Sequence, residues 1–99
     1  MPSNSQQTSA VVVLELSVNN HPGVMSHVCG LFSRRAYNLE AIACLPEKDG
    51  ATSRMWLRVS EENRLEQIVK QIQKLPDVRE VICHDGEHAV FTGLQSFMP

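Results

Sequence analysis

The sequence lacks the features that mark a membrane, secreted or disulfide-bonded protein. No apolar run approaches the roughly 20 residues of a membrane span, and residues 1–9 are too polar for a signal peptide. The cysteines Cys29, Cys44 and Cys83 are an odd number, lie far apart and include no C-x-x-C pair. Because this pattern suits a reducing compartment, we expect a cytoplasmic protein without a disulfide framework.

The chain also has few aromatic residues and no large excess of one charge. Aromatic residues make up 5% of the chain, charged residues 20%, and the formal net charge is −2. An RNA-recognition domain needs stacking aromatics on its strands and a basic surface, whereas here Trp56 stands alone between Arg54 and Arg58. We therefore expect no nucleic-acid partner and no membrane partner. The 99 residues suffice for one domain with one modest core.

Patterns for catalysis and metal binding are absent as well. There is no glycine-rich phosphate loop, and His21 and His27, although close to Cys29 in the sequence, fall on different faces of a helix. Four residues near the C-terminus could ligate a metal, but their spacing matches no closed zinc pattern. They are Cys83, His84, Asp85 and His88. We expect neither a catalytic site nor a metal site.

What the sequence does have is a regular alternation of strand and helix periods. Alternating apolar residues predict strands at 11–18, 39–45, 53–59 and 78–83. Helical apolar stripes predict helices at 22–36 and from Ser60, as N-cap with Glu61 and Glu62 in the first turn, to about residue 75. Residues 1–9 are expected to be disordered, 10–84 to form the domain, and 85–99 to form an irregular tail that docks on another surface.

This β-α-β-β-α-β order predicts an α+β, ferredoxin-like fold. Right-handed crossovers place both helices on one face of a four-stranded antiparallel sheet with the strand order 4-1-3-2. The other face would be too apolar for water, so we expect self-association through it. The residues expected on that face are Val11, Val13, Ile42, Cys44, Arg54, Trp56 and Arg58.

The turn Asn19-Asn20-His21-Pro22-Gly23-Val24, between the first strand and the first helix, is the best candidate for a binding site. Pro22 fits the first helical position, Asn20 or His21 can cap the helix, and Gly23 allows a ligand to approach the main chain. One interpretation is an ordinary capped helix. The other is an amino-acid site, in which the N–H groups of Gly23, Val24 and Met25 bind a carboxylate. The Asn20 side-chain oxygen, or a carbonyl at the end of the strand, would bind the ammonium group.

The residues from Leu14 to Glu40 resemble an ACT domain, and more narrowly the small regulatory subunit of acetohydroxyacid synthase (acetolactate synthase) in its short, isozyme I-like form. The turn N-x-x-G-V alone would indicate only an ACT domain. The run G-L-F-S-R-R-A-Y-N-L-E at 30–40 is much more specific to this subunit. The resemblance extends over about residues 10–84.

The resemblance implies a non-catalytic subunit that activates a large catalytic subunit carrying thiamine diphosphate, FAD and magnesium, with no cofactor of its own. It further implies a homodimer and feedback inhibition by branched-chain amino acids, chiefly valine, with leucine and isoleucine as alternatives. The effector would lie between the turn of one chain and the second strand of the partner. The residues that this implies are Asn20, His21, Pro22, Gly23, Val24 and Met25 in the turn, and Asn38, Ile42 and Leu45 in the strand.

Two other interpretations remain open from the sequence. The chain could be an ACT domain that serves another pathway and senses another amino acid, such as glycine or serine. It could also be an adaptor that holds a catalytic subunit without responding to any ligand.

Overall fold

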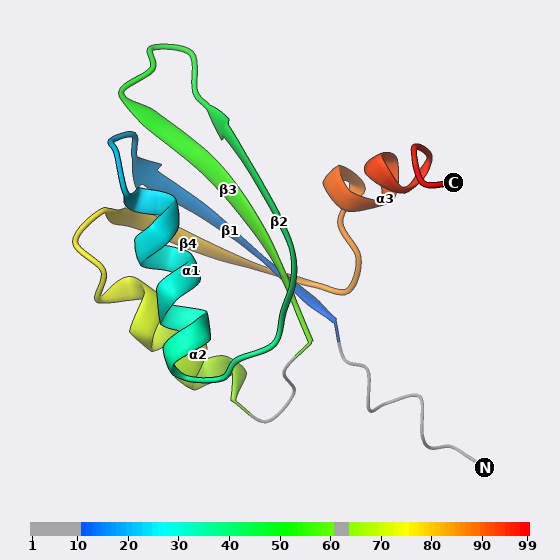
Figure 1. Ribbon diagram of the computed structural model, residues 1–99, viewed down its shortest axis with the longest axis horizontal. Coiled ribbons are helices and arrows are strands. Elements are labelled where there is room, and N and C mark those ends of the chain that lie inside the picture. Colours follow the sequence, from blue (N-terminus) through cyan, green and yellow to red (C-terminus); the bar gives the residue numbers. More distant parts are fainter. Residues whose placement is uncertain (1–10, 61–63) are drawn as a thin grey trace.

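In the computed structural model, the described residues, 11–60 and 64–99, form one antiparallel sheet and three helices. The strands are β1 (Val12–Asn19), β2 (Leu39–Pro46), β3 (Thr52–Val59) and β4 (Val78–Asp85), and the helices are α1 (Val24–Arg34), α2 (Leu65–Gln73) and α3 (Ala89–Gln95) (Figure 1). The strand order β2-β3-β1-β4 confirms the predicted topology. None of the described helices is long and apolar enough to cross a membrane.

The hydrophobic core lies between the sheet and the helices α1 and α2, which cover the same face (Figure 1). Every second residue of β1 and β3 points into it, as the period of two predicts. Each buried aliphatic side chain contributes about 1.5–3 kcal/mol to folding. The fully buried residues of these strands and helices include Leu14, Leu16, Val18, Val28, Met55, Leu57, Val59, Ile68 and Ile72.

Helix α1 ends at Arg34, two residues before the predicted end, because the chain turns at Ala36 with φ 56°. The Tyr37 N–H donates to Phe32 O at 2.9 Å, and the Ala36 N–H donates to Ser33 O at 3.3 Å. The rings of Phe32 and Tyr37 also pack edge to face, with their centroids 5.9 Å apart. This is a Schellman C-cap, and it sets the direction in which the chain enters β2.

Helix α2 begins later than predicted. Its N-cap is Arg64 and its first residue is Leu65, so the prediction that Ser60 caps the helix is wrong. Glu61 and Glu62, expected in its first turn, lie outside the described residues. A serine followed by two acids is typical of a helix start, but it does not fix the first residue by itself.

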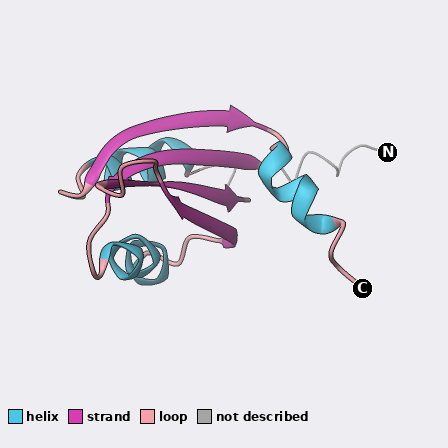
Figure 2. Cartoon of the chain, turned by 90° about the horizontal axis from the view of Figure 1, so that it is seen from above, coloured by secondary structure: helices cyan, strands magenta, loops and turns pink. Residues whose placement is uncertain are grey.

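The prediction of an irregular tail after His84 is also wrong. Strand β4 continues to Asp85, and the short helix α3 follows, capped by the His88 ring, whose Nδ1 accepts from the Val90 N–H at 3.0 Å. Phe91 is 5% exposed. Helix α3 lies on the side of the sheet away from α1 and α2 (Figure 1) and at one end of it (Figure 2). The tail therefore docks on its own sheet.

The open face of the sheet, turned away from α1 and α2, differs from the prediction in β2. Ile42 and Cys44 do not lie on it, since they pair with core-facing residues of β3 and pack against the core. The β2–β3 pairing shifts between Leu39 and Ala41, which sets the face of every later residue. Leu45 lies on the open face instead and is 59% exposed.

Candidate functional site

The turn between β1 and α1 has a different cap from the predicted one. Pro22 precedes the helix, and neither Asn20 nor His21 caps it, because the N-cap is Gly23, with no side-chain cap bond. The φ of Gly23 is 90°, and a Cβ built there would meet no atom within 4 Å. Backbone geometry therefore requires this glycine, while the space beside it stays open.

The start of α1 presents backbone donors to this space. The His27 N–H donates to Gly23 O at 2.9 Å, and the hydrogen-bond ladder of the helix begins there. The Val24 N–H, predicted as a carboxylate donor, instead donates to His21 O at 3.3 Å. The N–H groups of Met25 and Ser26 come next, at the positive end of the helix dipole. A carboxylate placed at this helix start would meet donors and a favourable field.

A pocket of about 310 Å³ opens beside the turn. All the predicted turn residues except Pro22 line this pocket. It also contains residues of β2 and β3 that the sequence did not single out. The lining residues are Asn20, His21, Gly23, Val24, Met25, Ser26, Cys44, Pro46 and Ser53.

Asn20 ties the turn to the hairpin between β2 and β3. Its side-chain Nδ2 donates to Gly50 O at 2.8 Å, and its backbone N–H donates to Ala51 O at 3.0 Å. The other end of the amide, Oδ1, can accept a hydrogen bond from a ligand. Asn20 thus fixes one wall of the pocket instead of capping the helix.

His21 ties the turn to the loop before β4. Its Nε2 lies 2.6 Å from Asp77 Oδ1, and its Nδ1 lies 2.6 Å from Pro22 O. The hydrogen bond to the Pro22 carbonyl and the one to Asp77 raise the pKa of His21, and the bond from His21 lowers the pKa of Asp77. Asp77 was not predicted as a partner of the turn, because the contact depends on how the loop before β4 folds back towards the turn.

The three predicted residues of the second strand lie apart from the turn within this chain. Asn38 precedes the far end of β2, where its Nδ2 donates to Ser60 Oγ at 3.3 Å. Ile42 packs against the core, and Leu45 is exposed on the open face. None of the three lines the turn pocket.

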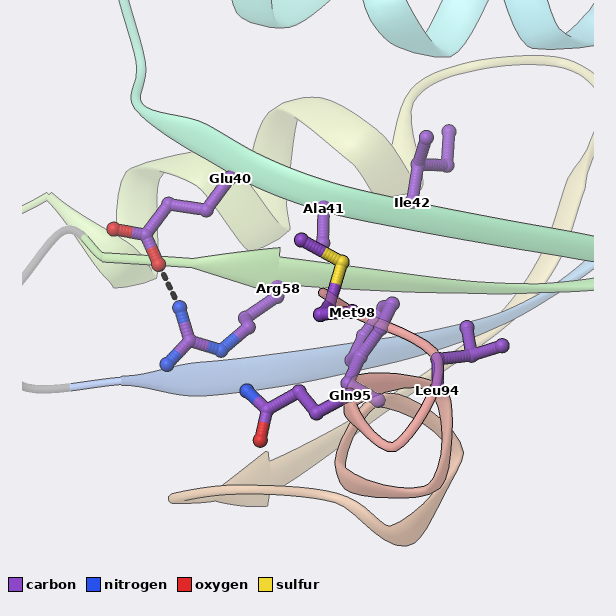
Figure 3. A pocket seen from close by; sticks show the side chains of 8 residues that line it. Glu40, Ala41, Ile42, Arg58, Leu94, Gln95 and Met98 are labelled. Atoms are coloured by element: carbon purple, nitrogen blue, oxygen red, sulfur yellow. Dashed lines mark hydrogen bonds and ion pairs between the residues drawn. The ribbon is translucent and has the colours of Figure 1, made fainter.

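A second pocket, of about 340 Å³, lies between α3 and β2 (Figure 3). Its polar wall is Arg58, which pairs with Glu40 across the pocket and with Glu87 at 2.5 Å. Its apolar wall includes Phe91, Leu94 and Met98. Because two carboxylates already neutralise Arg58, this pocket is less suited to an anionic ligand than the turn pocket.

The four potential metal ligands near the C-terminus do not come together in one cluster. His84 and His88 form a group with Glu15 within 4.8 Å, whereas Cys83 lies on the opposite face of β4. Glu15 already binds His84 Nε2 and Arg54 Nη1, both at 2.7 Å, and the Nδ1 of His88 accepts from the backbone. These side chains satisfy one another as a structural network.

The thiols show no feature of an activated nucleophile. Burial raises the pKa of Cys44 and of Cys83, which keeps both protonated at neutral pH. Cys29 is half-buried in α1. The described residues therefore form a binding pocket at a helix start without a nucleophile–base pair beside it.

Comparisons with known proteins show the family to which the chain belongs. The family model of the acetohydroxyacid synthase small-subunit-like ACT domain matches residues 14–80. The acetolactate synthase isozyme 1 small subunit of Escherichia coli K12 is 51% identical over 86 residues, which are 87% of this chain and 90% of that protein. The acetolactate synthase small subunit of Mycobacterium bovis is 42% identical over 78% of this chain and 46% of its own length.

Among solved structures, the acetolactate synthase small subunit from Thermotoga maritima matches with a TM-score of 0.68 and 34% identity. The match covers 74% of this chain and 46% of that one. The chain thus spans about half the length of the M. bovis and T. maritima proteins and most of the E. coli protein. It belongs to the family of ACT-domain small subunits of acetolactate synthase, and within that family it is a regulatory and not a catalytic subunit.

Proposed function

We propose that this chain senses valine on behalf of the large catalytic subunit of acetolactate synthase, activating that subunit and inhibiting it when valine is bound. Thiamine diphosphate, FAD and magnesium would belong to the large subunit, since this chain has no glycine-rich phosphate loop to hold a diphosphate. The observation that carries the proposal is the turn pocket at the start of α1, which offers anion donors beside a small apolar wall.

Each part of an amino acid has a partner in this pocket. The N-terminal donors of α1, at Met25 and Ser26, would bind the carboxylate. The Oδ1 of Asn20 would accept from the ammonium group. Cys44 and Pro46 would contact a branched side chain, because they form the apolar wall of the pocket.

A homodimer would complete the site with the strand residues that lie apart within one chain. Strand β2 is an edge of the sheet, so its outer side can pair with a second copy. If two β2 strands pair antiparallel about a two-fold axis, the Asn38 end of one lies beside the Pro46 end of the other. Pro46 lines the turn pocket, so Asn38 of the partner subunit would approach that pocket, whereas Ile42 would lie near the two-fold axis and Leu45 beside the far end of the paired strand.

Such a shared site would couple valine to the dimer. Occupancy ties the turn of one protomer to the strand of the other, and so favours one arrangement of the pair. Inhibition then requires that the two arrangements contact the catalytic subunit differently, because a ligand shifts an equilibrium only by its differential affinity.

An NMR titration of the full isotope-labelled chain tests this proposal. Valine should cause saturable chemical-shift changes at the backbone amides of residues 20–26, except Pro22, and near Asn38. Titrations with leucine and isoleucine compare the affinity of the site for the three branched-chain amino acids. Glycine and serine serve as controls. Equal responses to all the amino acids would contradict a branched-chain sensor, and shifts confined to the α3 pocket would contradict the placement of the site.

Gly23→Asp is the sharpest variant. It places a carboxylate where the carboxylate of the effector would bind, and its Cβ enters open space, so we expect valine binding to be lost while the fold is kept. The positive φ alone should cost about 1–2 kcal/mol of stability.

Gly86→Asp is the matched control, because Gly86 has φ 80° and equally open surroundings at the end of β4. The control should lose similar stability in urea unfolding but bind valine normally. If Gly23→Asp binds valine with unchanged affinity, the site is not at the turn.

A further inference from the structure

The protonation state of His21 determines whether a positive charge lies beside the turn pocket. Its two ring nitrogens both face oxygen atoms, the Pro22 carbonyl and the Asp77 carboxylate, each at 2.6 Å. A carbonyl and an ionised carboxylate can only accept hydrogen bonds, so both nitrogens must donate. A neutral imidazole has one N–H, whereas the imidazolium has two. The geometry therefore fits the charged form of His21.

We infer that Asp77 is a positioning residue of the effector site, which holds His21 as an imidazolium and thereby fixes the turn and places a positive charge beside the pocket. The inference rests on the proposed function for the identity of the ligand, a small α-amino acid carboxylate. His21 would act through its charge and its position, because both of its N–H groups are already engaged.

Asp77 is well placed for this role. Its side chain is 15% exposed, its own backbone carbonyl accepts from the Asn19 N–H at 2.8 Å, and Asn19 is the last residue of β1 before the turn. Asp77 is therefore tied to the turn at two points, its backbone carbonyl and its side-chain carboxylate.

Other charged groups near His21 leave Asp77 as its main partner. The His27 ring lies edge-on, with centroids 6.5 Å apart, and its Nδ1 is 3.7 Å from the second oxygen of Asp77. Arg79 of β4 donates to Asn19 Oδ1 at 3.3 Å. The hydrogen bonds to Pro22 and Asp77 raise the pKa of His21, in agreement with the charged form. As the pH rises through this raised pKa, His21 loses a proton and its positive charge. The neutral ring can then donate only one of the two hydrogen bonds.

The first test is direct. In the full chain with ¹⁵N-labelled histidine, long-range ¹H–¹⁵N correlations should show both nitrogens of His21 protonated, and this should persist to higher pH than in Asp77→Asn. Asp85→Asn is the control, because it removes one carboxylate from the opposite end of β4. Identical His21 titrations in the Asp77→Asn variant and the wild type would overturn the inference.

The second test links the pair to the ligand. The dissociation constant for valine, followed by amide shifts, should rise about fivefold or more between pH 6 and pH 8.5 in the wild type, because His21 loses its positive charge beside the pocket as the pH rises through its raised pKa. Asp77→Asn should weaken binding at pH 6 and flatten this profile, and Asp85→Asn should not. A wild-type profile that is flat, or that Asp77→Asn leaves unchanged, contradicts the role of Asp77 at the site.

The two tests separate the inference from the proposed function. If valine does not bind the wild type at any pH, the proposed function fails, while the ring-nitrogen spectra still decide whether Asp77 holds His21 in its charged form.

Discussion

Glu15 is the residue at which polar contacts from both strands beside β1 meet on the open face. It lies in the middle of β1, with its side chain 16% exposed, and binds Arg54 and His84 from the two neighbouring strands. Arg54 also pairs with Glu47 at 3.0 Å. The sequence predicted the alternation that places Glu15 on this face. It did not predict the network, because its members lie on strands far apart in the chain.

Replacing Glu15 by Gln should lower the free energy of unfolding at pH 7 by about 1–3 kcal/mol, the usual cost of losing charge-assisted hydrogen bonds. Burial tends to raise the pKa of Glu15, but the hydrogen bonds from His84 and Arg54 outweigh it, and the net pKa is lowered. The ionised form therefore stabilises the fold above about pH 4.3, the unfolded value, and this contribution is lost as the pH falls from there through the folded pKa.

Urea unfolding at pH 7 and at pH 3 measures this effect, with Glu80→Gln, an exposed carboxylate on β4, as the control. The difference between Glu15→Gln and the wild type should shrink at pH 3. A difference of the same size at both values would show that charge on Glu15 is not the cause.

At the scale of elements, the sequence predicted the order of strands and helices and the core faces of β1 and β3, because their periods are clear. It failed at β2, an edge strand with small or apolar residues on both faces, where alternation cannot choose the buried face. The turn residues were found, but the contacts of Asn20 and His21 were not. Both bind loops that are brought to the turn only by the folded sheet.

Helix α3 was missed because it is short and contains Gly93, so it carries no full helical period. Tertiary contacts hold it in place. Phe91 is buried, and the His88 ring lies 6.4 Å from the ring of Trp56, whose Nε1 is buried without a partner in the described part of the chain. Helix α3 therefore shields part of the open face that was expected to stay uncovered within one chain.

Phe91→Ala should detach α3 and expose Trp56. A buried Phe→Ala change costs about 3–5 kcal/mol in a rigid core, but detachment of the short helix should limit the loss here to about 1–3 kcal/mol. Since Trp56 is the single tryptophan, its emission should move to longer wavelength. Leu94→Ala, at a position that is 51% exposed, is the control and should leave the emission unchanged. An unshifted spectrum for Phe91→Ala would mean that α3 does not shield the indole.

At the scale of the whole molecule, we expect the proposed site to require a second copy of the chain. The turn pocket lies near the Pro46 end of β2, whereas Asn38 lies at the other end of the same strand. A single chain cannot bring these residues together. Antiparallel pairing of two edge strands can, and it would produce two equivalent sites per dimer. Dimerisation and valine binding should therefore respond together to changes on β2.

Leu45→Glu tests this coupling. Leu45 is 59% exposed on the edge strand, so a charge there should leave the monomer folded. It should weaken the dimer at least about tenfold, because it places a charge in the apolar contact between the two β2 strands, and it should weaken valine binding in parallel. Sedimentation equilibrium, with and without valine, measures the dissociation constant of the dimer. Phe97→Glu adds the same charge at an apolar residue that is 82% exposed and lies beyond α3, and should change neither property. If Phe97→Glu dissociates the dimer and Leu45→Glu does not, the two copies meet through the tail, and β2 is not their interface.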